Sequence, residues 1–171
     1  DVPSTFFFVP RKNHEGKTAN NILTMPPSYR SVRYDIHDYG SVVKTLACEG
    51  REIALHGIDA WHESKSATTE RDIIREIAGT RVDGVRMHWL YFSEGSPESL
   101  ARAGFLYDST LGFNESAGFR CGTTQVFKLN GTEELYELPL HIMDTALFTR
   151  DRMALSEQKA LQICRKMFKT F

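Results

Sequence analysis

The chain has 171 residues and a mass of 19.5 kDa; 41% of its residues are hydrophobic and 25% are charged, as expected for one soluble globular domain. Its 21 Lys and Arg residues nearly balance its 22 Asp and Glu residues, so the net charge of -1 argues against binding to nucleic acid or anionic membranes through bulk charge. No apolar run approaches the roughly 20 residues that cross a bilayer, so no membrane span is predicted.

The cysteines and the first residues bear on cellular location. Cys48, Cys121 and Cys164 are too few and too scattered for a disulfide framework or a Cys-x-x-Cys metal site. No basic stretch followed by an apolar core is present at the start of the sequence, so no signal peptide is predicted. These features predict reduced thiols and a cytoplasmic location.

Short apolar strands alternate with amphipathic helices along the chain. The pattern predicts strands at residues 5–9, 52–56, 82–87, 105–107, 125–129 and 135–140. It predicts helices at residues 39–47, 69–78 and 96–104, and a last one behind Ser156 as N-cap. Residues 11–30 are polar and contain Pro26-Pro27, which predicts a surface loop. The alternation is typical of βα units around a parallel sheet, so the sequence predicts an α/β fold.

In parallel α/β folds, sites gather at the carboxyl ends of the strands. The strand at 52–56 ends in His56, and Asp59, Trp61 and His62 follow within one short loop. Imidazole and carboxylate are ligands of zinc and similar ions, so this loop indicates a divalent metal site. The two histidines are not an i, i+4 helical pair, however, and ordinary hydrogen-bonded or exposed histidines are the alternative interpretation.

Arg86, His88 and Trp89 lie together at the end of the next predicted strand, residues 82–87. A fixed cation, an imidazole for proton transfer and a flat ring that stacks on a sugar are typical of a carbohydrate site. The alternative is that the neighbouring aromatic residues form core and that Arg86 pairs with a carboxylate.

Two later segments carry further polar candidates. Glycines near Arg120 predict a constrained loop that presents its side chain, and an Asp108–Arg120 salt bridge is the alternative. His141 and Asp144 lie just beyond Pro139, which indicates a strand end or a sheet edge. An ordinary polar strand end is the alternative for these two residues.

Taken in order, the strand ends resemble those of the polysaccharide deacetylase family. The matching segments are Thr5-Phe6-Phe7, Glu52-Ile53-Ala54-Leu55-His56-Gly57, Gly84-Val85-Arg86-Met87-His88, Tyr107-Asp108-Ser109-Thr110 and Glu137-Leu138-Pro139. Each segment is a weak signal, but their shared order over residues 3–148 is specific. The resemblance implies a deformed (β/α) barrel, a divalent metal that is usually zinc, and hydrolysis of an N-acetyl group from an amino sugar. It also implies that residues 1–171 are one partial domain, which lacks the first and last strands of the family.

Carried over by position, His56 matches the first metal-ligand histidine of the family. Ala60 stands where the family has its second ligand histidine, so Asp59, His62 or His88 would have to substitute. We therefore expect His56, Asp59 and His62 to hold the metal.

The resemblance also assigns catalytic and substrate-binding roles. Arg86 matches the arginine that orients the catalytic aspartate, and His88 is expected to be a ligand or a proton-transfer group. His141 stands in for the acid histidine of the family. Trp61, Trp89 and Arg120 are expected to contact the sugar.

The residue at position 60 leaves a second interpretation open. A chain that keeps the barrel without its metal ligands would be an inactive carbohydrate-binding or assembly module. Both interpretations imply a carbohydrate partner and no nucleic acid. The strand edges of an incomplete barrel predict pairing between copies of the chain, that is, a homo-oligomer.

Overall fold

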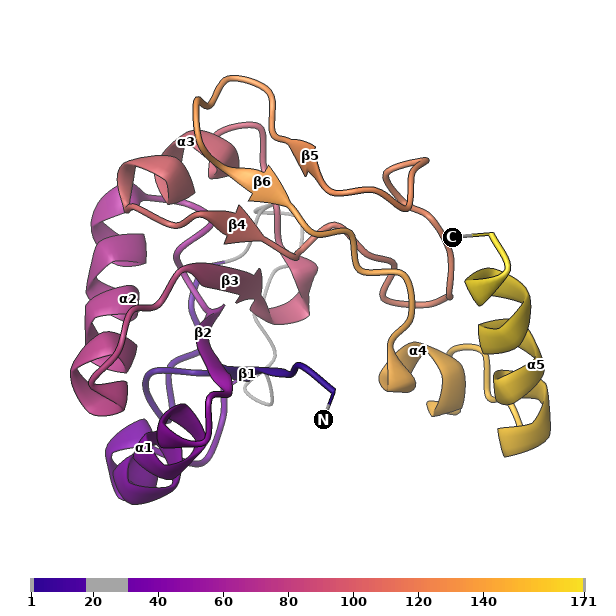
Figure 1. Ribbon diagram of the computed structural model, residues 1–171, viewed down its shortest axis with the longest axis horizontal. Helices are drawn as coiled ribbons and strands as arrows, with labels where there is room; N and C mark the ends of the chain where they lie inside the picture. The colour runs from indigo at the N-terminus through magenta and orange to yellow at the C-terminus, as the bar shows by residue number, and fades with distance from the viewer. Residues whose placement is uncertain (1, 18–30, 171) are drawn as a thin grey trace.

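A computed structural model describes residues 2–17 and 31–170 of the chain (Figure 1). Its strands are β1 (Thr5–Phe8), β2 (Glu52–Gly57), β3 (Gly84–Met87), β4 (Tyr107–Asp108), β5 (Phe127–Lys128) and β6 (Tyr136–Glu137). Its α-helices are α1 (Gly40–Cys48), α2 (Ser64–Ala78), α3 (Ser96–Arg102), α4 (Asp144–Phe148) and α5 (Glu157–Phe168). Short 3-10 helices lie at Ile36–Tyr39 and His88–Leu90. Each predicted strand overlaps an observed one, whereas α2 begins at Ser64 rather than at residue 69.

The six strands form one open sheet in the order β1-β2-β3-β4-β6-β5. All neighbours are parallel except β5 and β6, so the predicted parallel α/β fold is confirmed. β1 and β5 are the two edges, and the described strands do not close into a barrel. One row of register partners crosses the sheet through Leu55, Val85, Asp108 and Glu137.

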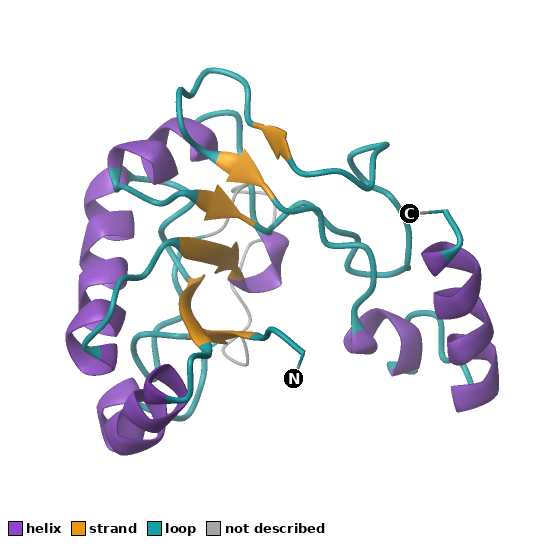
Figure 2. Ribbon diagram, viewed as in Figure 1, coloured by secondary structure: helices purple, strands orange, loops and turns teal. Residues whose placement is uncertain are grey.

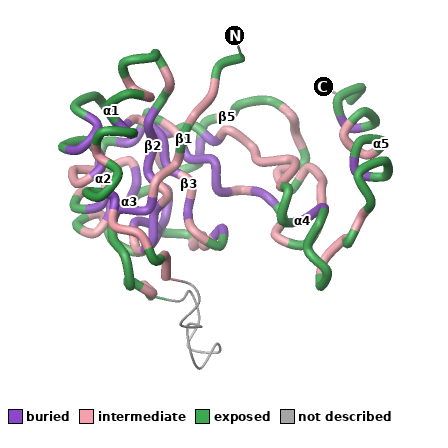
Figure 3. Tube along the Cα trace, turned by 90° about the horizontal axis from the view of Figure 1, so that it is seen from below, coloured by how far each residue is buried: buried purple, intermediate pink, exposed green. Residues whose placement is uncertain are grey.

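Helices α1, α2 and α3 cover one side of the sheet (Figure 2). The centre of β2 is fully buried at Ile53, Ala54 and Leu55, and Ile53 and Leu55 belong to the apolar core where α1 and α2 pack against this strand. Helix α2 contributes an apolar stripe that includes Ile74 and ends at Gly79, whose φ of 67° is easily reached only by glycine. Figure 3 shows the buried positions concentrated in this sheet-and-helix body.

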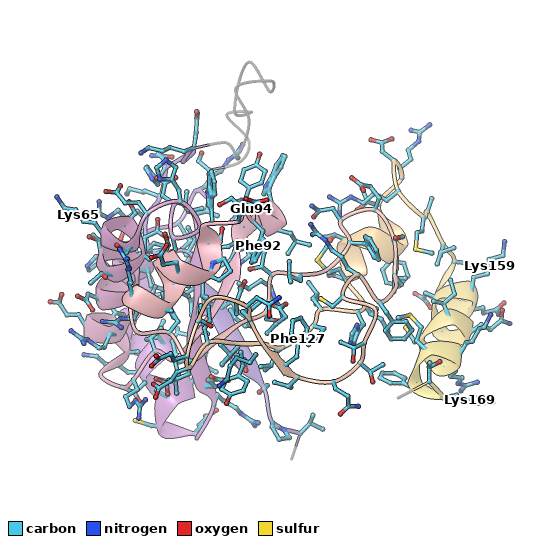
Figure 4. All side chains as sticks on the ribbon, turned by 90° about the horizontal axis from the view of Figure 1, so that it is seen from above. Lys65, Phe92, Glu94, Phe127, Lys159 and Lys169 are labelled. Carbon is cyan, nitrogen blue, oxygen red and sulfur yellow. The ribbon has the colours of Figure 1, made fainter. Side chains whose placement is uncertain are left out.

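The last two helices lie beyond the carboxyl ends of the strands, away from α1, α2 and α3 (Figure 1). Helix α5 begins where predicted, because the Ser156 side chain accepts a hydrogen bond from the Lys159 backbone N–H at 3.4 Å. Lys159 and Lys169 at this helix lie at the opposite end of the molecule from Lys65 on α2 (Figure 4).

Two further predictions concern the polar loop at residues 11–30 and the absence of a membrane-spanning helix. The predicted loop at 11–30 lies partly outside the described residues, and its described part, residues 11–17, contains no helix or strand. Within the described ranges, no helix is both long enough and apolar enough to cross a membrane.

Candidate active site

Two histidines meet at the carboxyl ends of β2 and β3. His56 is the register partner of Arg86, and His88 follows the last residue of β3. The Nε2 atom of His56 lies 3.0 Å from Nδ1 of His88, and the two rings meet edge to face with centroids 5.0 Å apart. The parallel register therefore brings together two side chains that are 32 positions apart in the sequence.

The hydrogen bonds of His56 define its tautomer. Its Nδ1 atom lies 2.9 Å from the backbone carbonyl oxygen of Arg86. Because a carbonyl only accepts, Nδ1 carries the hydrogen and Nε2 presents a lone pair towards His88. Burial, followed by the nearby charge of His88, lowers the pKa of His56 to about 3. The His56 imidazole is therefore neutral at pH 7, as a base or a metal ligand must be.

This histidine pair opens into a pocket of about 360 Å³, which we call the histidine pocket. Its lining residues come from the ends of β2 and β3 and from the loops beyond β4 and β6: His56, Arg86, Met87, His88, Trp89, Leu90, Asn114, Glu115, Met143, Thr145 and Arg152. A pocket of this size accommodates a sugar unit.

The pocket wall after His88 has strained backbone. Trp89 and Leu90 have φ values of 62° and 53°, a left-handed conformation that costs about 1–3 kcal/mol for a residue other than glycine. The Asn114 side-chain amide donates a hydrogen bond to the Trp89 carbonyl oxygen at 3.1 Å and supports this turn. Trp89 remains 36% exposed, so its ring is accessible to a ligand.

Arg86 ties neighbouring strands together beneath the pocket. Its Nε donates to the Ser109 carbonyl oxygen at 3.1 Å and its Nη2 donates to Ser109 Oγ at 2.8 Å. Its guanidinium carbon lies 4.4 Å from the centroid of the Phe7 ring, a cation–π contact. The sequence led us to expect a carboxylate beside Arg86, but within residues 2–17 and 31–170 it forms no ion pair with one.

A second hollow, which we call the Arg120 pocket, adjoins the first. Its volume is about 390 Å³, and it shares Trp89, Leu90, Asn114 and Glu115 with the histidine pocket. Arg120 donates to the Gly112 carbonyl oxygen at 2.8 Å, and the Asp108 carboxyl accepts from the Thr110 hydroxyl instead. The alternative of an Asp108–Arg120 salt bridge is therefore wrong. The shared residues make the two pockets neighbouring parts of one surface.

Asp59 belongs to a different cluster from His56. Its Oδ2 lies 2.8 Å from His14 Nε2, and its Oδ1 accepts from the Lys17 backbone N–H at 2.6 Å. Glu70 of α2 accepts from the backbone N–H groups of Ile58 and Asp59 at 2.9 and 2.8 Å. Burial raises the pKa of Glu70 to about 7, although these two hydrogen bonds oppose the shift. This cluster lines another pocket of about 390 Å³, which we call the Asp59 pocket.

The three metal ligands expected from the sequence, His56, Asp59 and His62, therefore do not lie together. Among the described residues, the group of three possible ligands whose ligand atoms lie within 4.8 Å of one another is His14, Asp59 and Glu70, without His56 or His62. The reason is the turn after β2, which Glu70 fixes so that Asp59 meets His14. His62 is exposed with its ring against Trp61. Neither His14, in a polar loop, nor Glu70, on a helix, was identified from the sequence.

Two other predicted site residues lie away from the histidine pocket. Trp61 is only 5% exposed and packs in the core against Tyr91, so it is not available to stack on a sugar. His141 packs its ring against Phe119 with centroids 5.0 Å apart, and it does not line the pocket. His88 is thus the imidazole beside His56, and His141 is not.

Comparisons with known proteins identify the fold. No family model matches the chain, and no curated protein matches it. A solved structure of a Mycobacterium smegmatis protein assigned as a polysaccharide deacetylase matches with a TM-score of 0.57 and 22% identity, over 99% of this chain and 54% of the other. Puue allantoinase matches with a TM-score of 0.54 and 16% identity, over 78% of this chain and 45% of the other. The chain has the polysaccharide deacetylase fold, as the strand ends predicted, and spans about half the length of these two structures.

Proposed function

We propose that the chain is part of a polysaccharide deacetylase-type hydrolase, which removes an acetyl group from an amino sugar or a related amide in the histidine pocket. The observation that carries this proposal is the His56–His88 pair, whose nitrogens lie 3.0 Å apart at the carboxyl edge of a parallel sheet. Parallel α/β folds place their reactive groups at this edge. The shared fold with a protein assigned as a polysaccharide deacetylase and with an allantoinase supports a hydrolase of this fold.

The residues of the pocket match the requirements of amide hydrolysis. Water that attacks the acetyl carbonyl must lose a proton, and the amine that leaves must gain one. Without a bound cation, His88, which borders the pocket, carries out these proton transfers, while His56 fixes the orientation of the His88 ring. Trp89 supplies a flat face for the sugar, and Arg120 in the adjoining pocket contacts the next unit of a longer chain.

The family resemblance implies a divalent cation, with zinc as the usual ion. His56 Nε2 and His88 Nδ1 are 3.0 Å apart, close to the separation of about 3.3 Å between two nitrogens on one tetrahedral zinc ion. The bond from His56 Nδ1 to a backbone carbonyl is also typical of ligating histidines. These two residues would hold the cation, which when bound supplies a Lewis acid that polarises the acetyl carbonyl and activates water. No third imidazole or carboxylate among the described residues joins them.

One observation favours a second candidate, a carbohydrate-binding or assembly module without catalysis. Ala60, at the position of the family's second ligand histidine, is fully buried and packs close to Gly57. A ligand therefore cannot be restored there without opening the core. In that case the pockets would bind a sugar chain without cleaving it.

Acetate release from N-acetylated chito-oligosaccharides distinguishes the two candidates. We expect hydrolysis by the protein, and a loss of about 10²–10⁴-fold in kcat for His88→Ala, as is usual for removal of a general acid or base. The matched control is His37→Ala, because His37 is an exposed imidazole paired with Asp35, and it should retain the full rate. Unchanged hydrolysis by His88→Ala would contradict the catalytic assignment, and binding without acetate release would support the module.

A further inference from the structure

Two fully buried carboxyl groups lie side by side in the sheet. Asp108 of β4 and Glu137 of β6 are register partners on adjacent parallel strands, and both side chains have 0% exposure. Register partners point to the same side of a sheet, and neighbouring strands are about 4.8 Å apart. Neither residue lines the histidine pocket, so the proposed reaction leaves their role unexplained.

Each carboxyl group has one bonded and one unbonded oxygen. The Thr110 hydroxyl donates to Asp108 Oδ1, and the Leu111 backbone N–H donates to Glu137 Oε1 at 2.9 Å. Asp108 Oδ2 and Glu137 Oε2 are buried and have no hydrogen-bond partner within the described residues. A buried carboxylate oxygen without a donor is costly, and a proton on the neighbouring carboxyl would supply that donor.

The surrounding charges compensate for only one negative charge. The charge of the partly buried Arg86 on β3 lowers the pKa of both carboxyl groups, and that of the exposed Arg120 lowers the pKa of Glu137. The other titratable groups nearby are the Cys121 thiol and, close to Arg86, the Tyr107 hydroxyl. Both are already neutral at pH 7 at their ordinary pKa values, and burial raises the pKa of each further. One proton on the pair would leave a single negative charge for Arg86 to offset.

The pKa values of Asp108 and Glu137 agree with one retained proton. Burial raises the pKa of Asp108 to about 7, and hydrogen bonds and Arg86 only partly oppose the shift. Burial, and then repulsion by Asp108, raises the pKa of Glu137 to about 8. Like charges buried side by side favour retention of one proton.

We propose that Asp108 and Glu137 share one proton, and that this pair is a positioning device that holds residues 109–111 against the end of β3. The shared proton follows from the register and the unbonded oxygens and is independent of the reaction, whereas the positioning role rests on the proposed function. Thr110 Oγ donates to Asp108 and accepts from the Met87 backbone N–H at 3.0 Å, directly before His88. A second negative charge would disturb this link and, through it, the catalytic imidazole.

Infrared spectroscopy tests the shared proton directly. We expect the folded protein at pH 7 to show the C=O band of a protonated carboxyl group, and Glu137→Gln and Asp108→Asn each to lose the same band completely. Each amide keeps the carbonyl that accepts the existing hydrogen bond and donates an N–H to the remaining carboxylate. Glu70 contributes its own band, so each variant is compared with the wild type. The exposed Glu134→Gln is the control and should change nothing.

A band unaffected by either substitution overturns the proposal, and so does loss of only half of it in each variant, because that result means two separate protons. Two independent variants keep the test decisive if one of them fails to fold.

Unfolding as a function of pH gives a second readout. The folded pair keeps a proton that the unfolded carboxyls release, so the contribution of the pair to stability is complete below pH 4 and decreases as pH rises towards 8. The test compares the unfolding equilibrium constants of the wild type and of Glu137→Gln. The ratio of the wild-type constant to the variant constant should increase by up to about tenfold for each unit of increase in pH, as far as pH 8. A constant ratio between pH 6 and pH 8 overturns the proposal.

The positioning role has its own readout. Because the second ionisation disturbs His88, kcat of the wild type should fall above pH 8, and Glu137→Gln should lack this fall. If the infrared band of the shared proton is present but the protein hydrolyses no substrate, only the proposed function is contradicted. If kcat falls equally above pH 8 in the wild type and in Glu137→Gln, only the positioning role is contradicted.

Discussion

His56 is a histidine that remains neutral in the folded chain, and this property makes stability depend on pH. Burial lowers its pKa from 6.5 to about 3, so below pH 6.5 the unfolded chain binds a proton that the folded chain does not. Its contribution is therefore complete above pH 6.5 and is lost as pH falls towards 3.

We predict that His56→Gln removes this dependence. Each pH unit below 6.5 should cost the wild type about 1.4 kcal/mol relative to the variant, or about 2 kcal/mol at pH 5. Urea unfolding at pH 5 and pH 7 measures the difference. His37→Gln, at an exposed histidine, is the control, and equal pH slopes for His56→Gln and the wild type would contradict the burial of His56.

The left-handed turn at Trp89 is testable by a pair of substitutions. Both Trp89→Ala and Trp89→Gly remove the ring, but only glycine adopts a φ of 62° without strain. We predict that Trp89→Gly is more stable than Trp89→Ala by about 1–2 kcal/mol in chemical denaturation, and that both weaken sugar binding equally. If the alanine variant proves as stable as the glycine variant, the turn is not strained.

At the scale of single residues, sequence reasoning succeeded where strand register decides neighbours. His56, Arg86 and His88 come from the ends of adjacent parallel strands, so their proximity follows from the order of the strands. It failed where a distant side chain fixes a loop, because nothing in a short sequence window shows that Glu70 will bind the backbone of residues 58 and 59. Trp61 illustrates the same limit, since its loop position gave no sign that it packs in the core.

At the scale of elements, Glu70 connects helix α2 to the turn after β2. Glu70→Ala would leave the Ile58 and Asp59 N–H groups without their acceptors, at about 1–3 kcal/mol for each buried group. We predict a loss of about 2–4 kcal/mol in the free energy of unfolding at pH 6, measured by urea denaturation. Glu76→Ala is the matched control, because Glu76 lies on the same helix but is exposed, and it should change stability by less than about 0.5 kcal/mol. Equal losses in the two variants would show that Glu70 does not hold the turn.

The elements themselves were largely predictable, because apolar runs and amphipathic spacing reflect burial directly. The boundaries of the elements were less predictable. Helix α2 begins at Ser64, and its first turn is polar, so a hydrophobicity pattern does not indicate it. β4, β5 and β6 span only two residues each, whereas the apolar runs predicted longer strands. Pro139 explains part of that difference, because β6 ends before it at Glu137.

At the scale of the molecule, parallel strand order brings polar strand ends to one edge, and the sequence was sufficient to predict this. It did not predict that the candidate ligands would separate into two clusters, His56 with His88 and Asp59 with His14 and Glu70. The separation depends on which way each loop turns after its strand, which tertiary packing decides. The main question is therefore which of these two clusters binds a metal ion.

The metal content of the purified protein and of two matched histidine variants answers it. After incubation with zinc and removal of excess ion, we predict about one ion per chain in the wild type and in His14→Ala, and none in His56→Ala. That result would locate the metal in the histidine pocket. An ion that is kept by His56→Ala and lost by His14→Ala, or no ion in any of the three proteins, would contradict the proposed metal site at His56 and His88.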